Sequence, residues 1–165
     1  MASEVAGFRE YVTGRMDQLR RTAYLLCSDW HTADDLVSTA LVKLYRHWGR
    51  ASTVDNLHAY TRQILVRAWL DECRRPWRRE RAWETLPDRG APVAFEVADR
   101  VALLAQLAEL PPRQRAVIVL RYFCDLSIED TAEVLGCTAG TVKSQTARAL
   151  QTLRGRLVGI AYSEK

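Results

Sequence analysis

Residues 127–148 read SIEDTAEVLGCTAGTVKSQTAR, and this stretch decides the fold of the C-terminal part of the chain. Ser127 followed by two carboxylates is typical of a helix N-terminus, because its side-chain oxygen accepts a hydrogen bond from a backbone N–H and acidic groups favour the positive helix end. Gly136 predicts a tight turn after that helix, and Thr138 predicts the cap of a second helix. The buried face of the first helix is expected to consist of Ile128, Ala132 and Leu135.

The second helix of this stretch is predicted to bury an apolar side and to expose small, polar and basic residues near its start. The inward residues are Val142, Thr146, Ala149, Leu150, Leu153 and Leu157, and the outward ones are Thr141, Lys143, Ser144, Ala147 and Arg148. A short helix, a glycine turn and such a second helix are typical of a helix-turn-helix that reads duplex DNA in the major groove. The exposed basic and hydroxyl side chains suit phosphates and base edges. An antiparallel helix pair with solvated charges is the alternative.

Upstream of this stretch, the sequence predicts further helices and a linker. Apolar residues recur at helical spacing from Val101 to Leu110, stop at two prolines, and return over residues 116–123. Prolines and a glycine interrupt any helix over residues 82–97, where acidic residues outnumber the single arginine. We therefore expect a first domain over residues 1–81, a linker over 82–97 and a second domain over 98–165.

The N-terminal part is predicted to be a three-helix bundle, because its apolar residues recur three and four positions apart. The first helix is expected at about residues 7–27. The second is expected to open with Thr32 as its cap and to end at Gly49. A polar loop over residues 50–55 then leads to a third helix that starts near Asn56. Together these elements predict an all-α fold of two small helical domains joined by a flexible linker, the C-terminal one a helix-turn-helix.

The end of the first domain is rich in arginine and aromatic residues. Residues 60–83 contain seven arginines and three acidic residues, interleaved with Tyr60, Trp69, Trp77 and Trp83. Guanidinium groups follow phosphates and aromatic rings stack on unpaired bases, so this pattern favours contact with single-stranded or melting DNA. The alternative is a solvated helix end whose tryptophans belong to the core, and Trp69 in particular is expected in the core.

Composition agrees with a nucleic-acid partner and restricts other classes of function. The 165 residues carry a formal net charge of +4, a mild excess that indicates a polyanionic partner only because it is locally clustered. The chain offers no apolar run of the roughly 20 residues that span a bilayer, so no membrane insertion is expected. Four scattered cysteines and three scattered histidines match no metal-ligand or catalytic spacing. We predict a cytoplasmic protein with reduced thiols that is not an enzyme and binds no metal or cofactor.

Several motifs, in their order along the chain, resemble the extracytoplasmic-function (ECF) sigma factors of the sigma-70 family, in particular those of actinobacteria. Residues 22–26 and 33–37, TAYLL and ADDLV, are similar to the core of the second sigma domain. Residues 110–115, 126–132 and 140–144, LPPRQR, LSIEDTA and GTVKS, are similar to the fourth. The resemblance covers nearly the whole chain. It implies a protein that binds core RNA polymerase and directs promoter-specific transcription initiation.

The resemblance also implies a role for each segment. The start of the second helix would dock on the β′ clamp helices of the polymerase, and the fourth domain would meet the β flap. The polymerase-binding residues would be Asp34, Asp35, Leu36, Val37 and Ser38. Family members often carry glutamine and glutamate where this chain has Ser38 and Thr39. Promoter DNA and an anti-sigma factor would be further partners.

Two sets of residues would bind the promoter, one at each element. At the −10 element the loop and third helix would capture melted DNA, with one flipped base held by the loop. These residues would be Ser52, Thr53, Asn56, Tyr60, Arg62, Gln63, Arg67, Arg74, Arg75, Arg78 and Arg79. At the −35 element they would be Arg113, Arg121, Thr141, Lys143, Ser144, Ala147 and Arg148.

Two other functions fit parts of the sequence. A LuxR-like helix-turn-helix regulator has a similar DNA-binding helix pair and acts without being a polymerase subunit. An interaction module, such as an anti-sigma antagonist or a truncated sigma factor, would bind a protein partner without promoter function. The arginine and tryptophan residues that end the first domain disfavour the regulator, and the presence of both DNA-facing segments disfavours the interaction module.

Overall fold

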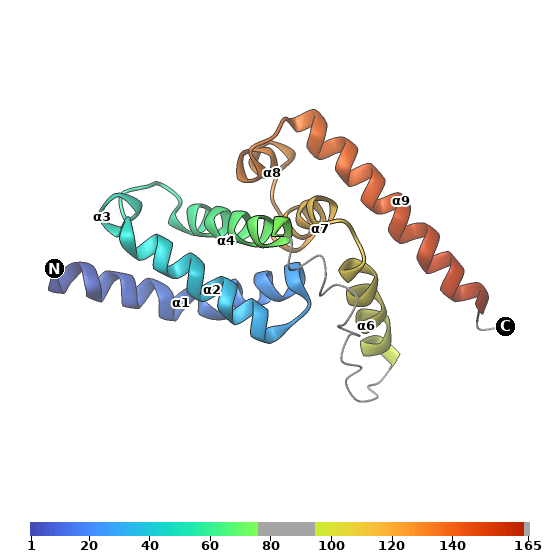
Figure 1. Ribbon diagram of the computed structural model, residues 1–165, viewed down its shortest axis with the longest axis horizontal. Helices are drawn as coiled ribbons and strands as arrows, with labels where there is room; N and C mark the ends of the chain where they lie inside the picture. The colour runs from blue at the N-terminus through green and yellow to red at the C-terminus, as the bar shows by residue number, and fades with distance from the viewer. Residues whose placement is uncertain (76–94, 164–165) are drawn as a thin grey trace. The chain divides into compact units, whose positions relative to one another are not determined.

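The computed structural model describes residues 1–75 and 95–163, and the chain divides into two compact units, Met1–Glu72 and Cys73–Lys165 (Figure 1). All regular elements of the described residues are helical, which confirms the predicted fold class. Most of the predicted linker, Arg78, Arg79 and the side chain of Leu157 lie outside the described residues. No helix among the described residues is both long and apolar enough to cross a membrane.

The first unit is built on three long helices, as the sequence predicts. They are α1 (Ala2–Cys27), α2 (Trp30–Arg46) and α4 (Leu57–Arg74), and α1 starts five residues earlier than expected. Helices α1 and α2 pack along each other (Figure 1). Because the buried residues recur at helical spacing, each helix turns one stripe inward. This core includes Leu19, Ala23, Leu26, Leu36, Leu44, Leu65 and Trp69.

The start of α2 differs from the prediction in its capping residue. Asp29, not Thr32, is the N-cap: its carboxylate accepts hydrogen bonds from the backbone N–H of Thr32 at 2.8 Å and from the Thr32 hydroxyl at 2.6 Å. These two hydrogen bonds, the side-chain one first, lower the pKa of the Asp29 carboxyl. With Asp29 as the cap, α2 starts at Trp30, three residues before the position that a Thr32 cap would give.

The end of α2 was also predicted incorrectly. Helix α2 ends at Arg46, and Gly49 lies inside a separate one-turn helix, α3 (Trp48–Ala51), so the connecting loop begins at Ser52 rather than at residue 50. Trp48 is buried in a cluster with Leu44 and Ala51. Its ring centre lies 5.2 Å from that of Phe8, at an edge-on angle of 84°. Burial of this large ring offsets the poor intrinsic stability of so short a helix.

The second unit contains a chain of shorter helices that pack on a long C-terminal one. They are α6 (Phe95–Ala108), α7 (Pro112–Ile118), a π-helical turn η1 (Val119–Phe123), α8 (Ile128–Leu135) and α9 (Ala139–Ser163) (Figure 1). Helix α6 begins inside the predicted linker. The predicted helix over residues 116–123 is in fact α7, started by Pro112, followed by the π turn. A proline is favoured at this first position because its fixed φ suits the helix and its missing N–H is not needed there.

Candidate functional site

The helix-turn-helix forms where it was predicted, with each of its capping residues in the expected role. The Ser127 hydroxyl accepts from the backbone N–H of Asp130 at 3.0 Å, and the Thr138 hydroxyl accepts from that of Thr141 at 3.1 Å. Gly136 has φ 63° and ψ 41°, a left-handed conformation that a residue with a Cβ adopts only with strain. The turn therefore fixes how α9 leaves α8.

One face at the start of α9 is left open to solvent. Lys143, Ser144, Ala147 and Arg148 are all exposed, whereas Val142 and Ala149 are fully buried. Positions three and four apart share a helix face, which links Lys143 to Ala147, and Ser144 to both Ala147 and Arg148. The four exposed residues therefore form one surface, which we call the recognition face. Thr141 lies at its edge, half-buried, with its hydroxyl 3.0 Å from that of Thr138.

The two arginines predicted to reach phosphates near this face differ. Arg113 is half-buried on α7. Arg121 turns inward: its Nη1 donates to the carbonyl of Leu126, and its Nε is buried without a hydrogen-bond partner among the described residues. Arg121 thereby joins the π turn to the residues that precede α8. The guanidinium thus commits one of its donors to a backbone carbonyl of its own unit, and the phosphate contact of Arg121 stays a prediction.

In the first unit, the loop between α3 and α4 borders a hollow of about 520 Å³. The predicted residues Ser52, Thr53 and Asn56 are exposed there, and Thr53 and Tyr60 line the hollow. The side chain of Asn56 also caps α4, because its Oδ1 accepts from the backbone N–H of Ala59 at 3.0 Å. Two further lining residues, His47 and Arg50, were not among the predicted site residues. The lining consists of His47, Arg50, Ala51, Thr53, Val54 and Tyr60.

The arginines of α4, and Arg75 directly after it, do not share one environment. Arg67, Arg74 and Arg75 are exposed, which fits a backbone-contacting role, and Gln63 is half-buried. Arg62 is only 7% exposed, so it is withdrawn from the surface, unlike the other three arginines. It lies one residue after the fully buried Thr61, whose hydroxyl receives a hydrogen bond from Tyr11 at 2.8 Å. Helix phase, which the sequence pattern alone left ambiguous here, turns Arg62 inward.

His58 lies half-buried near the same basic residues. Burial first, and then the charges of Arg62 and Arg15, lower its pKa to about 4. A histidine with a folded pKa below its unfolded value of about 6.5 binds protons better when unfolded. The free energy of unfolding is therefore expected to fall as the pH falls from about 6.5 to about 4. Denaturant titrations across this range check it: His58→Gln should flatten the dependence, whereas the exposed His31→Gln should keep it. An equal slope in His58→Gln would contradict this role.

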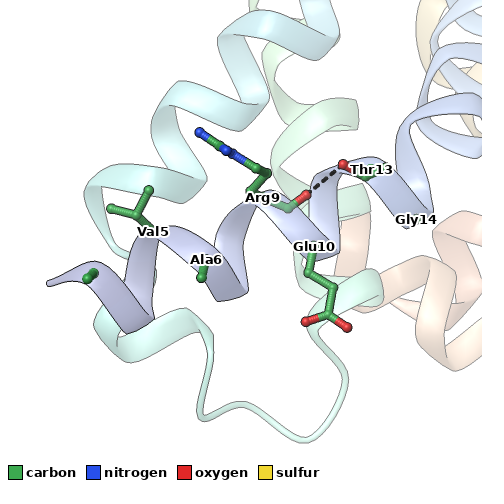
Figure 2. A pocket seen from close by; sticks show the side chains of 7 residues that line it. Val5, Ala6, Arg9, Glu10, Thr13 and Gly14 are labelled. Carbon is green, nitrogen blue, oxygen red and sulfur yellow. Dashed lines mark hydrogen bonds between the residues drawn. The ribbon is translucent and has the colours of Figure 1, made fainter.

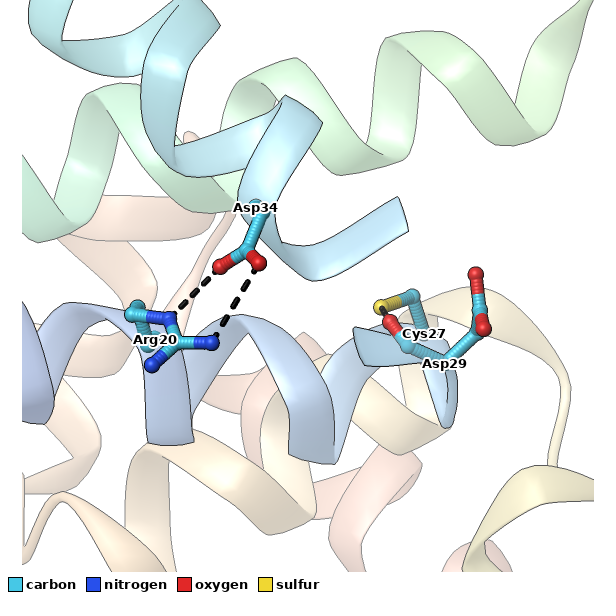
Figure 3. Close-up of polar contacts among 4 residues, drawn as sticks. All are labelled: Arg20, Cys27, Asp29 and Asp34. Atoms are coloured by element: carbon cyan, nitrogen blue, oxygen red, sulfur yellow. Dashed lines mark hydrogen bonds and ion pairs between the residues drawn. The ribbon is translucent and has the colours of Figure 1, made fainter. Parts of the chain in front are cut away.

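The predicted polymerase-binding residues at the start of α2 include both buried and exposed side chains. Leu36 is 4% and Val37 3% exposed, so both belong to the core of the first unit. Asp35 and Ser38 are exposed. Asp34 is bonded within the chain: Nε of Arg20 lies 2.6 Å from one of its carboxylate oxygens and Nη2 lies 3.2 Å from the other (Figure 3). This bonding lowers the pKa of the Asp34 carboxyl and raises that of the Arg20 guanidinium.

A second hollow, of about 840 Å³, runs along the exposed side of α1 (Figure 2). None of the site residues predicted within the described parts of the chain lines it. Its lining is Ala2, Val5, Ala6, Arg9, Glu10, Thr13 and Gly14. Residues 1–75 and 95–163 contain no group of three or more acidic, histidine or cysteine side chains arranged to hold a metal ion.

Comparison with known proteins identifies the family. The chain matches the model of Sigma-70 region 2 over residues 12–79 and that of Sigma-70, region 4 over residues 100–153. It is 40% identical over 160 residues to the RNA polymerase sigma-E factor of Streptomyces avermitilis, across 93% of this chain and 87% of the relative. It is 34% identical over 170 residues to the ECF RNA polymerase sigma factor SigM of Mycobacterium tuberculosis, across 96% of this chain and 83% of the relative.

A solved structure agrees with these sequence matches. The sigma factor RpoE of Bartonella quintana, crystallised with the anti-sigma factor NepR, is 27% identical, with a TM-score of 0.75 over 92% of this chain and 96% of that one. The N-terminal half is thus matched as well as the C-terminal half, which disfavours a LuxR-like regulator. Sigma factors are transcription initiation factors that bind core RNA polymerase. The chain belongs to the sigma-70 family as an ECF sigma factor that directs transcription initiation.

Proposed function

We propose that the chain contacts a promoter at two points, with the recognition face of α9 in the major groove of the −35 element. The observation that carries this proposal is the exposure of Lys143, Ser144, Ala147 and Arg148 on one face of a helix that buries Val142, Ala149 and Leu153 on another. Basic and hydroxyl side chains donate to base edges and phosphates, and alanine contacts the thymine methyl group. Arg113, at the start of α7, would contact the neighbouring phosphates.

The first unit would bind the melted −10 element. Thr53 and Tyr60 line the hollow beside the α3–α4 loop, and Ser52 and Asn56 are exposed in the same loop. A hollow of about 520 Å³ lies within the size range of small-molecule sites, so a single flipped base has room there. Of the predicted backbone contacts in the described residues, Arg67, Arg74 and Arg75 are exposed and suited to phosphates.

Protein partners would bind both units. We propose that α2 docks on the β′ clamp helices of the polymerase and that the second unit meets the β flap, which would place both units on the enzyme in the cytoplasm. An anti-sigma factor is a further proposed partner, supported by RpoE, which is crystallised with NepR and resembles this chain over almost its full length.

Run-off transcription tests the proposal. The purified chain is mixed with core RNA polymerase and a pool of candidate promoters, and the control omits the chain. We expect initiation at a subset of promoters, and weak binding of the chain alone to the same DNA. The proposal fails if core polymerase gains no promoter-dependent initiation. Tight, specific duplex binding by the chain alone would support an independent regulator, and polymerase binding without initiation would support an interaction module.

A further inference from the structure

Arg62 of α4 is a mostly buried cation whose guanidinium has no partner in the described parts of the chain. Only 7% of the residue is exposed, and the guanidinium forms no hydrogen bond, ion pair or ring contact within residues 1–75 and 95–163. Its nitrogens are not among the fully buried polar atoms that lack a partner, so the small exposed fraction includes the guanidinium. Arginine stays charged at physiological pH, and a cation withdrawn from water without a counter-ion destabilises a fold. The position therefore favours an anion from outside the chain.

A histidine and a second arginine lie close to this guanidinium. His58 precedes Arg62 by four residues on α4, so the two side chains are neighbours on one helix face. Both ring nitrogens of His58 are buried without a hydrogen-bond partner among the described residues. The Tyr11 hydroxyl donates to that of Thr61 at 2.8 Å, which holds α1 against this part of α4. Arg15 is exposed one turn after Tyr11, so two helices contribute donors to one place.

The charges that act on this cluster are positive. Burial first, and then the charges of Arg62 and Arg15, lower the pKa of His58 to about 4. Burial raises the pKa of Tyr11, against the effect of its hydrogen bond and of the same two arginines. No acidic side chain contributes to either pKa. Arg15 itself donates to Oε1 of Gln18 at 3.2 Å, a neutral acceptor. The cluster thus contains two cations and no carboxylate that balances them.

The donors and their burial restrict the class of anion. Guanidinium groups bind the oxygens of phosphate-like ions two at a time, and a neutral imidazole donates one further hydrogen bond. Donors from three side chains on two helices suit an ion with several acceptor oxygens. Because Arg62 is only 7% exposed, a small free ion reaches it more readily than a strand of nucleic acid does.

We propose that Arg62, Arg15 and His58 form a binding site for a small inorganic oxyanion of the phosphate class. The ion would accept hydrogen bonds from both guanidinium groups and from one ring N–H of His58. It would neutralise the buried cation and fasten the first turns of α4 to α1, directly after the loop of residues 52–56. The site goes beyond the proposed promoter contacts, because it needs neither DNA nor polymerase.

An NMR titration of the full-length chain with inorganic phosphate tests the site. The His58 ring signals are assigned through His58→Gln, and sodium chloride keeps the ionic strength constant. We expect a saturable shift of these signals at millimolar phosphate, and a rise in the pKa of His58, because a nearby anion favours the imidazolium form. Sulfate should compete with phosphate. The signals of His31, whose side chain is 88% exposed, should show no saturable shift.

Three variants separate a bound ion from a general salt effect. Arg62→Met removes the charge and keeps an apolar stem, so it should abolish the phosphate response of His58 and raise the thermal unfolding midpoint in phosphate-free buffer. Arg15→Gln changes an exposed residue and should weaken phosphate binding about threefold without loss of the fold. The matched control Arg9→Gln, an exposed arginine of the same helix, should bind phosphate as the unaltered chain does.

Three results would overturn the proposal. The first is the absence of a saturable His58 shift with phosphate and with sulfate. The second is a shift that persists unchanged in Arg62→Met and in Arg15→Gln. The third is a response of His58 to a single-stranded −10 oligonucleotide but not to free phosphate, which would make the cluster a contact for the promoter strand. Run-off transcription is not needed for any of these measurements, so failure of this site and failure of the proposed function are distinguishable.

Discussion

Replacing Lys143 and Arg148 together with alanine is expected to abolish selection of promoters by their −35 element. Both side chains are exposed on the recognition face of α9, and neither supports the core beneath it, which consists of Val142, Ala149 and Leu153. Each lost base contact should cost about 1–3 kcal/mol of discrimination. The measurement is the ratio of run-off transcripts from promoters with intact and scrambled −35 elements.

The matched control for this variant is Arg154→Ala, which removes an exposed arginine further along the same helix. It should lower affinity slightly through lost charge, with little change in the transcript ratio. Binding measured at several salt concentrations separates base contacts from phosphate contacts. Loss of a phosphate contact reduces the dependence of affinity on salt and weakens binding to all DNA sequences alike. An unchanged transcript ratio in the double variant would refute the assigned roles of Lys143 and Arg148.

Replacing Trp48 with alanine is expected to give the largest loss of stability among single changes in the first unit. Trp48 is 8% exposed and packs in the cluster of Leu44 and Ala51, with Phe8 and Tyr11 around its ring. Truncation of a buried aromatic residue costs about 3–5 kcal/mol, from lost burial and from the cavity that remains. Chemical denaturation followed by circular dichroism measures the change.

The functional consequence of Trp48→Ala should be specific to DNA melting. Helix α3 has a single turn and is held by this ring, so its loss should free residues 52–56, including Ser52 and Thr53, from their fixed position. Permanganate reactivity of −10 thymines in the polymerase complex should fall. The control Trp30→Ala removes a tryptophan that is 47% exposed and should cost much less stability. Equal losses in the two variants would contradict the proposed anchoring of α3.

Local sequence signals were sufficient for the elements whose ends are set by neighbouring residues. The caps Ser127 and Thr138 and the turn at Gly136 act within four residues of the chain, so their chemistry was predictable without any tertiary contact. The same holds for Asn56 at the start of α4. At the start of α2 the pattern predicted Thr32, but Asp29, three residues earlier, also carries a side-chain oxygen that accepts from a helix N-terminus, and it is the N-cap.

The partners and burial of long, flexible side chains were harder to predict than the helix caps. Arg62 belongs to a basic stretch that favours DNA contact and Arg121 was expected near phosphates, yet the first is buried and the second donates to the carbonyl of Leu126. A guanidinium on a flexible stem reaches several different partners, and which one it meets depends on residues from elsewhere in the fold. For Leu36 and Val37, the motif predicted a docking segment but did not indicate which of its residues face outward and which face the core.

The sequence by itself determined the all-α class, the helix-turn-helix of residues 127–148 and the family resemblance, because periodicity, caps and turns are properties of short segments. Only the tertiary structure decided how Asp34 and Asp35 differ, since that difference comes from Arg20, fourteen residues away on another helix. It also packed Trp48 of α3 against Phe8 of α1. Pairing across helices depends on how their faces pack, and a one-dimensional pattern does not contain that information.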